Sequence, residues 1–199
     1  MPTSCEKPHP PPMDFKKAER LVKELHRVFE DYPHFLIQGT ALGAYRDKGF
    51  TPTERDIDIG MLGEDLVKCG GWLALDLINA DFEIITVNKP FNRIRVIKAF
   101  KYGIKVDIAS YVLWKDVRFC CSNLTEYSIV HPRKLLENTT SIQWFGKEWT
   151  IPKDIEGYLE REYGEDWRTP KYDHVSKSRI THFRRNEGIP NDILDKIKA

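Results

Sequence analysis

Two aspartates one residue apart, Asp56 and Asp58, are the residues best suited to chemistry in this chain. Side chains alternate faces along an extended strand, so the two carboxylates should project together while Ile57, Ile59 and Met61 point to the opposite, core-facing side. Ionised carboxylates this close repel one another, and a cation between them removes the repulsion. Hard oxygen ligands suit Mg²⁺ or Mn²⁺. The pair therefore predicts a divalent-metal site.

A small-residue turn, Gly39-Thr40, lies upstream of the pair and opens a short apolar run from Ala41 to Tyr45. Gly39 would let a ligand approach the backbone, and Thr40 supplies a hydroxyl and an amide. If the run forms a helical turn, its free amides make an anion site. A lone Asp-x-Asp is most often a solvated strand end, but this turn and the arginine that follows it favour a combined metal and phosphate site.

These features together resemble the signature of LicD and fukutin-type proteins, a branch of the nucleotidyltransferase-fold superfamily. The family motif is Gly-Thr/Ser-x-Leu-Gly-x-x-Arg, a proline, then Asp-x-Asp. The positions that match it are Gly39, Thr40, Leu42, Gly43, Arg46, Pro52, Asp56 and Asp58. Glu54 and Arg55 depart from it, because the family usually has aspartates directly before the pair.

A second match, far along the chain, is similar to the closing motif of the same family. It consists of Pro152, Leu159, Tyr163-Gly164, Trp167 and Pro170. The resemblance therefore spans roughly residues 35 to 170.

Asp107 is the candidate for a third carboxylate. In the run from Lys105 to Ala109, alternation places Lys105, Asp107 and Ala109 on one face, so Asp107 can point from a neighbouring strand toward the ions held by Asp56 and Asp58. Nucleotidyltransferase-fold enzymes carry their third acidic residue on such a strand, and the resemblance nominates Asp107. The alternative is an edge-strand aspartate paired with Lys105 or Lys101.

Three arginines are candidate phosphate ligands. Arg46 belongs to the matched motif, while Arg93 and Arg95 share one face of a strand by alternation. Guanidinium groups bind phosphate oxygens in a planar, bidentate manner. Arg93 and Arg95 could therefore clamp a diphosphate, although exposed arginines on a strand are also common.

Composition narrows the possible classes of protein. The formal charge of +1 argues against a general nucleic-acid binder, because no global positive field attracts a polyanion. The spacing of Cys5, Cys69, Cys120 and Cys121 fits neither a zinc site nor a secreted disulfide framework, so apolar packing is expected. We see no apolar run long enough for a signal peptide or membrane span and expect a cytoplasmic location.

The chain divides into three parts. Residues 1–13 hold five prolines and should form a flexible arm, 14–170 the nucleotidyltransferase-like catalytic domain, and 171–199 a basic C-terminal extension packed on or near the active site. The alternative for the extension is a solvated helix face. The expected helices are 14–31, 64–79 and 153–163, and the expected strands are 35–38, 56–61, 82–87, 93–100 and 104–113, with a hairpin of 141–145 and 148–151.

This order predicts an α+β protein with a nucleotidyltransferase-like fold. We expect one mixed sheet with helices packed mainly on one side, plus a C-terminal helical segment. At 199 residues with 41% hydrophobic content, a single substantial core is the default.

The resemblance implies a phosphotransferase that uses Mg²⁺ or Mn²⁺. It would move a phospho-alcohol, such as phosphocholine or ribitol phosphate, from a CDP-linked donor to a glycan hydroxyl and release CMP. Asp56, Asp58 and Asp107 would hold two divalent ions, and the phosphate ligands would be Gly39, Thr40 and the arginines. One alternative transfers a nucleoside monophosphate from an NTP to a small molecule or protein hydroxyl. Another, of a different class, is a non-catalytic nucleotide- or glycan-binding protein that retains the fold.

Overall fold

The computed structural model describes residues 12–88, 96–123 and 127–170. Most of the proline-rich arm, the basic extension 171–199, and both Arg93 and Arg95 lie outside the described residues. Among the described residues, no helix is both long and apolar enough to cross a bilayer.

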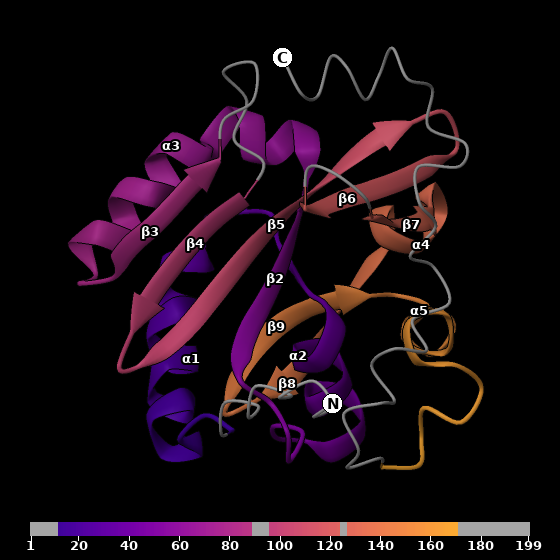
Figure 1. Ribbon diagram of the computed structural model, residues 1–199, viewed down its shortest axis with the longest axis horizontal. Helices are drawn as coiled ribbons and strands as arrows, with labels where there is room; N and C mark the ends of the chain where they lie inside the picture. The colour runs from indigo at the N-terminus through magenta and orange to yellow at the C-terminus, as the bar shows by residue number, and fades with distance from the viewer. Residues whose placement is uncertain (1–11, 89–95, 124–126, 171–199) are drawn as a thin grey trace, which may run out of the picture.

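A seven-stranded mixed sheet forms the centre of the molecule (Figure 1). Its five main strands run in the order β1-β2-β5-β4-β3, and only the β2–β5 pair is parallel. The hairpin of β6 and β7 extends the sheet from the end of β5. The strands are β1 (Phe35–Leu36), β2 (Asp56–Leu62), β3 (Glu83–Asn88), β4 (Val96–Lys101), β5 (Ile104–Trp114), β6 (Val117–Asn123) and β7 (Tyr127–Pro132).

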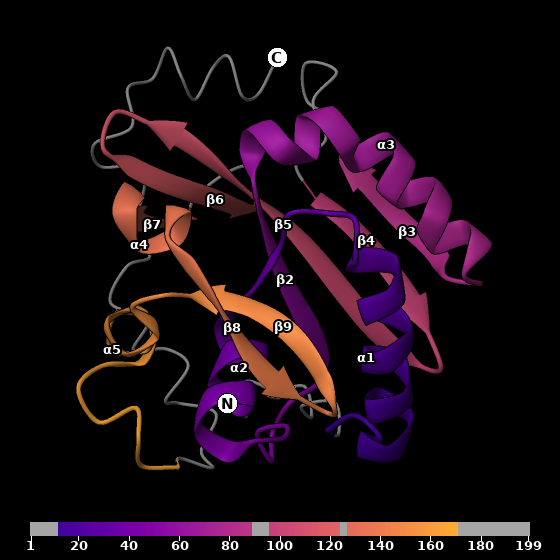
Figure 2. The same cartoon turned by 180° about the vertical axis from the view of Figure 1, so that it is seen from behind.

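Two long helices cover one face of this sheet, as Figure 2 shows from behind. α1 (Phe15–Phe29) is amphipathic, and the Asp14 side chain caps it by accepting the amides of Lys16 and Lys17. α3 (Gly63–Asn79) connects β2 to β3 and packs against β3 and β5. The α+β class, the mixed sheet and the placement of helices mainly on one side are therefore confirmed.

Smaller elements complete the fold around β1 and β2. α2 (Gln38–Leu42) continues into a π-helical turn, η1 (Gly43–Asp47), and α5 (Ile155–Tyr163) packs against α2. The hairpin of β8 (Thr139–Trp144) and β9 (Lys147–Pro152) packs against β1 and α1. Its turn residues, Phe145 and Gly146, both have positive φ, as a tight two-residue hairpin requires.

The observed elements follow the predicted ones closely, with three differences. Two consecutive glycines predict a weakened or kinked helix, but Gly70 and Gly71 leave α3 unbroken from Gly63 to Asn79. β1 ends at Leu36 because Gln38 already begins α2, with a φ of 49° and its amide donated to the Tyr158 hydroxyl at 2.9 Å.

The third difference is that β6 and α4 (Arg133–Glu137) were not predicted from the sequence, whereas for β7 only its end, at His131 before Pro132, was expected. β6 contains Arg118, whose side chain is buried by ion pairs with Glu64 of α3 and Glu137 of α4. A buried arginine interrupts the apolar pattern by which a strand is recognised, and only its partners on other elements explain its position.

Gly60 provides a test of how tightly β1 packs on β2. A Cβ at this position would lie 2.5 Å from the Phe35 ring and 2.8 Å from Ile37 Cγ2. We expect Gly60→Ala to lower the free energy of unfolding by about 1–3 kcal/mol, measured by urea denaturation. Gly71→Ala is the matched control, since a Cβ there meets nothing within 4 Å, and it should add about 0.5–1 kcal/mol in the helix. Equal effects of the two changes would contradict this packing.

Candidate functional site

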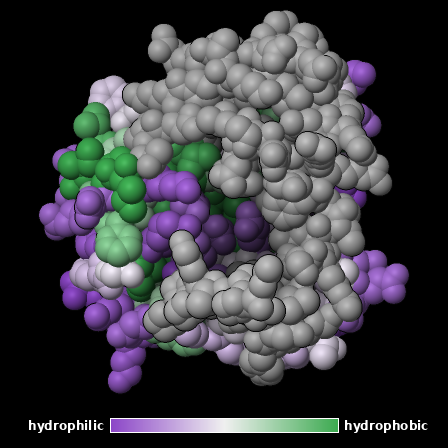
Figure 3. All heavy atoms as spheres, in the orientation of Figure 1, coloured by the Kyte–Doolittle hydropathy of each residue, from purple (hydrophilic) through white to green (hydrophobic). Residues whose placement is uncertain are grey.

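The strand β2 presents its two aspartates on one side and its apolar residues on the other. Ile57, Ile59 and Met61 are fully buried, whereas Asp56 and Asp58 are only partly buried. Because α1 and α3 cover the apolar side, the carboxylates lie on the face seen in Figure 1. On that face, hydrophilic side chains of the described residues are visible near the middle of the molecule (Figure 3).

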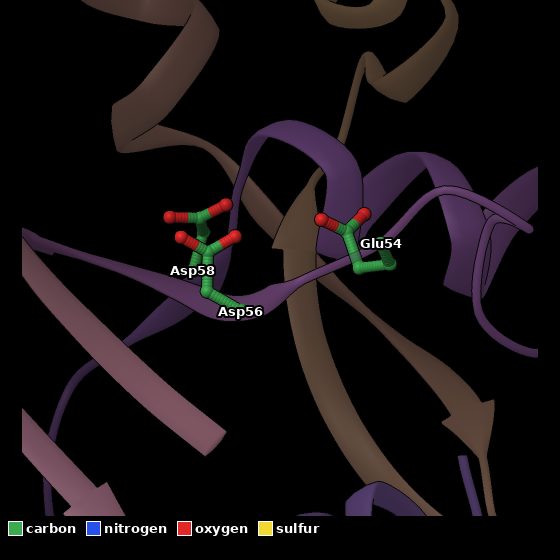
Figure 4. A group of neighbouring side chains, drawn as sticks. All are labelled: Glu54, Asp56 and Asp58. Carbon is green, nitrogen blue, oxygen red and sulfur yellow. The ribbon is translucent and has the colours of Figure 1, made fainter. Parts of the chain in front are cut away.

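Glu54 joins these aspartates to form a cluster of three carboxylates (Figure 4). One oxygen from each of Glu54, Asp56 and Asp58 lies within 4.8 Å of the others. Glu54 is 2% exposed, and the Thr51 hydroxyl donates to its Oε2 at 3.2 Å. Sequence reasoning treated Glu54 only as a departure from the family pattern. Glu54 precedes β2 and follows a turn, so strand alternation could not have placed it beside the pair.

The space that Gly39 leaves is filled by Glu54. A Cβ on Gly39 would lie 2.0 Å from Glu54 Oε2. The absence of a side chain at this position therefore admits a carboxylate of the protein itself, whereas the sequence analysis expected it to admit a ligand.

Asp107 lies next to the cluster on the neighbouring strand. In the parallel register of β2 and β5, Asp58 is opposite Asp107 and Asp56 is opposite Lys105. Lys105 Nζ lies 2.9 Å from Asp56 Oδ2 and 2.8 Å from Asp107 Oδ2. Asp107 therefore shares a face with the pair, and it is also bound to Lys105, as the alternative interpretation expected. β5 is a central strand, with β2 and β4 on its two sides.

The clustered charges change the protonation of the site. Burial, together with the negative charges of Asp56, Glu54 and Asp107, raises the pKa of Asp58 well above its ordinary value, and Lys105 partly opposes this shift. Burial alone would lower the pKa of Lys105, but its hydrogen bonds to Asp107 and Asp56 outweigh that effect and raise it. The site therefore has an excess of negative charge that a divalent cation would neutralise.

The donor set fits a hard divalent ion. All the clustered ligands are carboxylate oxygens, the type that Mg²⁺ and Mn²⁺ prefer. Asp107 Oδ1 is buried without a hydrogen-bond partner among the described residues, so it too can accept a cation.

Thr40 positions the backbone of the carboxylate strand. Its hydroxyl, in a residue 1% exposed, accepts a hydrogen bond from the Asp58 amide at 2.8 Å. Thr40, a predicted phosphate ligand, is thus hydrogen-bonded directly to Asp58, a predicted metal ligand. The link joins α2 to β2 and sets the distance between the two motif segments.

Arg46, which belongs to the opening motif of the family, contacts the closing motif. Its guanidinium donates to Asp47 Oδ1 and Oδ2 at 2.7 and 2.8 Å and to the Trp167 carbonyl at 2.9 Å. Because Trp167 belongs to the closing motif, Arg46 holds that segment against η1. The other two predicted phosphate ligands, Arg93 and Arg95, lie outside the described residues.

A buried pair of ionisable side chains, one on β7 and one on α5, supports the site and was not predicted from the sequence. His131 Nε2 lies 2.8 Å from Glu162 Oε1, and the two side chains are 0% and 1% exposed. The His131 ring packs on Tyr158, whose hydroxyl accepts the Gln38 amide just before Gly39. This pair therefore ties α5 and β7 to the turn that carries Thr40. Its two members are far apart in the sequence, and no local pattern joins them.

Solved structures similar to this chain share its fold. A crystal structure of ANT(2")-Ia in complex with adenylyl-2"-tobramycin superposes with a TM-score of 0.53 at 12% identity, covering 92% of this chain and 95% of that one. A solution structure of the antibiotic-resistance factor ANT(2")-Ia gives 0.54 at 10% identity, covering 93% and 91%. At such low identity the likeness shows the nucleotidyltransferase fold and nothing finer.

Sequence comparison gives the family. No curated protein matches the chain. The family model for LicD/FKTN/FKRP, nucleotidyltransferase domain, matches residues 31–154, which include the turn at Gly39, the carboxylate cluster and Asp107. This match covers more than half of the chain, so the protein belongs to the LicD/FKTN/FKRP family of nucleotidyltransferase domains.

Proposed function

We propose that this protein is a metal-dependent phosphotransferase that moves a phospho-alcohol from a CDP-linked donor to a glycan hydroxyl. The observation that carries the proposal is the group of Glu54, Asp56 and Asp58, with Asp107 in register beside it, inside the segment that matches the LicD family model. The family and the fold support a transferase of the nucleotidyl- or phosphotransferase type.

In this proposal the carboxylates of Asp56, Asp58 and Asp107 would hold Mg²⁺ or Mn²⁺, and Glu54 would add a carboxylate ligand from the position just before the pair. A bound ion neutralises phosphate oxygens and lowers the pKa of the attacking hydroxyl. The glycan hydroxyl oxygen forms a bond to the phosphorus that carries the alcohol. The bond from that phosphorus to CMP breaks, and the hydroxyl proton is released.

Residues around the cluster would bind and orient the donor. The hydrogen bond from the Asp58 amide to Thr40 fixes the carboxylate strand relative to the Gly39-Thr40 turn. Thr40 remains the proposed ligand of the distal phosphate, whereas the space beside Gly39 is filled by Glu54. Arg46 uses three of its five N–H donors on Asp47 and Trp167, which leaves two for a phosphate. Arg93 and Arg95 remain proposed diphosphate ligands.

A second candidate function is nucleotidyl transfer from an NTP to a hydroxyl of a small molecule or protein. It is favoured by the likeness to ANT(2")-Ia, which was solved with an adenylylated aminoglycoside. The same carboxylates would serve both reactions. A non-catalytic binding protein is the least favoured alternative, because it would have no need to keep the carboxylates together.

Two leaving groups distinguish the first two functions. With Mg²⁺ present, we expect CMP release from CDP-choline or CDP-ribitol in the presence of glycan acceptors, followed by chromatography. Pyrophosphate release from any of the NTPs, with no CMP from the CDP-alcohols, would contradict the proposed function and support the second. No release from either donor class would favour the non-catalytic alternative.

Asp58→Asn tests the role of the carboxylate cluster. Replacing one charged ligand by an amide should lower the transfer rate by about a hundredfold or more, because less charge holds the ion at the reacting phosphate. Circular dichroism should show an unchanged fold. Asp81→Asn is the matched control, since Asp81 is exposed at the end of α3 and should retain full activity. An active Asp58→Asn variant would show that the metal assignment is wrong.

The raised pKa of Asp58 predicts how stability depends on pH in metal-free protein. The folded chain keeps a proton on Asp58 that the unfolded chain releases above the ordinary value of 3.8, so this contribution to stability is present at low pH and is lost as the pH rises through the folded-state pKa. Compared with wild type in urea denaturation, Asp58→Asn should therefore gain stability progressively from about pH 4 upward.

Adding Mn²⁺ at neutral pH should reverse that ranking, because the wild type binds the ion in its folded state only. A stability difference that is constant with pH, or unaffected by Mn²⁺, would contradict the electrostatic description of the site.

A further inference from the structure

Lys105 lies between Asp56 of β2 and Asp107 of β5, and its position limits the number of metal ions that the site can hold. Resting on the proposed function, we propose that Lys105 takes the place of a second metal ion, so that the site binds one divalent cation per chain. The ammonium would lie between Asp56 and Asp107, and the ion beside Glu54, Asp56 and Asp58.

The Lys105 ammonium occupies the space that a second ion would need. Lys105 Nζ lies 2.9 Å from one oxygen of Asp56 and 2.8 Å from one oxygen of Asp107. Two-metal phosphoryl-transfer sites place their ions about 3.5–4 Å apart, with a carboxylate shared between them. An ion that joined the same two oxygens at the usual distance of about 2.1 Å would occupy the space of the ammonium. The lysine and a second ion therefore exclude each other.

The lysine bridge uses only one carboxylate oxygen of each of the two aspartates. Lys105 binds Oδ2 of Asp56 and Oδ2 of Asp107, so each carboxylate keeps its Oδ1. Asp107 Oδ1 is buried without a hydrogen-bond partner among the described residues. Glu54 and Asp58, two residues before and two residues after Asp56, supply further carboxylate oxygens to the same cluster. These oxygens can therefore coordinate one ion while Lys105 stays bound to Asp56 and Asp107.

The strand register holds Lys105 in place. Its backbone lies directly opposite Asp56 on β2 and two residues before Asp107 on β5, so both contacts are made from one face of a central part of the sheet. An ammonium is a compact point charge with three donors, which suits a position between two carboxylates. Lys98 gives a comparison on the same face: it lies opposite Asp107 on β4 but makes no ion pair among the described residues.

The test is the number of Mn²⁺ ions bound by the purified protein, measured by titration with detection of free Mn²⁺ by electron paramagnetic resonance. Wild type should bind one ion per chain. Lys105→Met, which keeps the apolar stem and removes the charge, should bind two. The matched control, Lys98→Met, should still bind one. Thermal melting followed by circular dichroism establishes that each variant is folded.

The outcomes separate this inference from the proposed function. Two ions on wild type, or one ion on folded Lys105→Met, would overturn the inference and leave the proposed function standing. No ion bound to wild type would overturn both. Anomalous diffraction from wild-type crystals soaked in Mn²⁺ gives a measurement that needs no variant: one peak beside Asp58, with Lys105 Nζ still between Asp56 and Asp107, supports the inference, and a peak in place of the ammonium overturns it.

Discussion

The parallel pairing of β2 with β5 brings like charges together, and the rest of the site depends on that constraint. Their register sets Asp58 opposite Asp107 and Asp56 opposite Lys105. Neighbouring strands lie about 4.8 Å apart, so the carboxylates cannot separate without breaking the ladder. Repulsion and burial raise the pKa of Asp58, and the single lysine opposes only part of this effect. The excess of negative charge at the site therefore follows from the pairing of β2 with β5.

The opposite face of the same strands is buried, and this burial stabilises the fold despite the repulsion between the carboxylates. Ile57 and Ile59 of β2 and Val106 and Ile108 of β5 are fully buried beneath the helices. Removing such side chains from water is worth about 1.5–3 kcal/mol each, so the apolar face stabilises the strand pair that carries the repelling carboxylates. One strand pair can therefore carry a core on one side and a strained charge cluster on the other.

Much of this arrangement was predictable from local patterns. Alternation placed Asp56 and Asp58 on one face of their strand, and three-and-four spacing of apolar residues gave α1 to within a few residues of its observed ends. Both patterns depend only on the repeat of a strand or a helix. The strand β6 could not be found in this way, because the buried Arg118 is explained only by Glu64 and Glu137 on other elements.

The sequence by itself determined which side chains share a face, since that follows from backbone geometry along one element. Tertiary structure alone decided what those side chains touch. Glu54 fills the space left by Gly39, Lys105 bridges Asp56 and Asp107, and Arg46 holds Trp167. Each of these contacts depends on the register between strands or on the packing of distant segments, and neither is encoded in the spacing of residues along a single element.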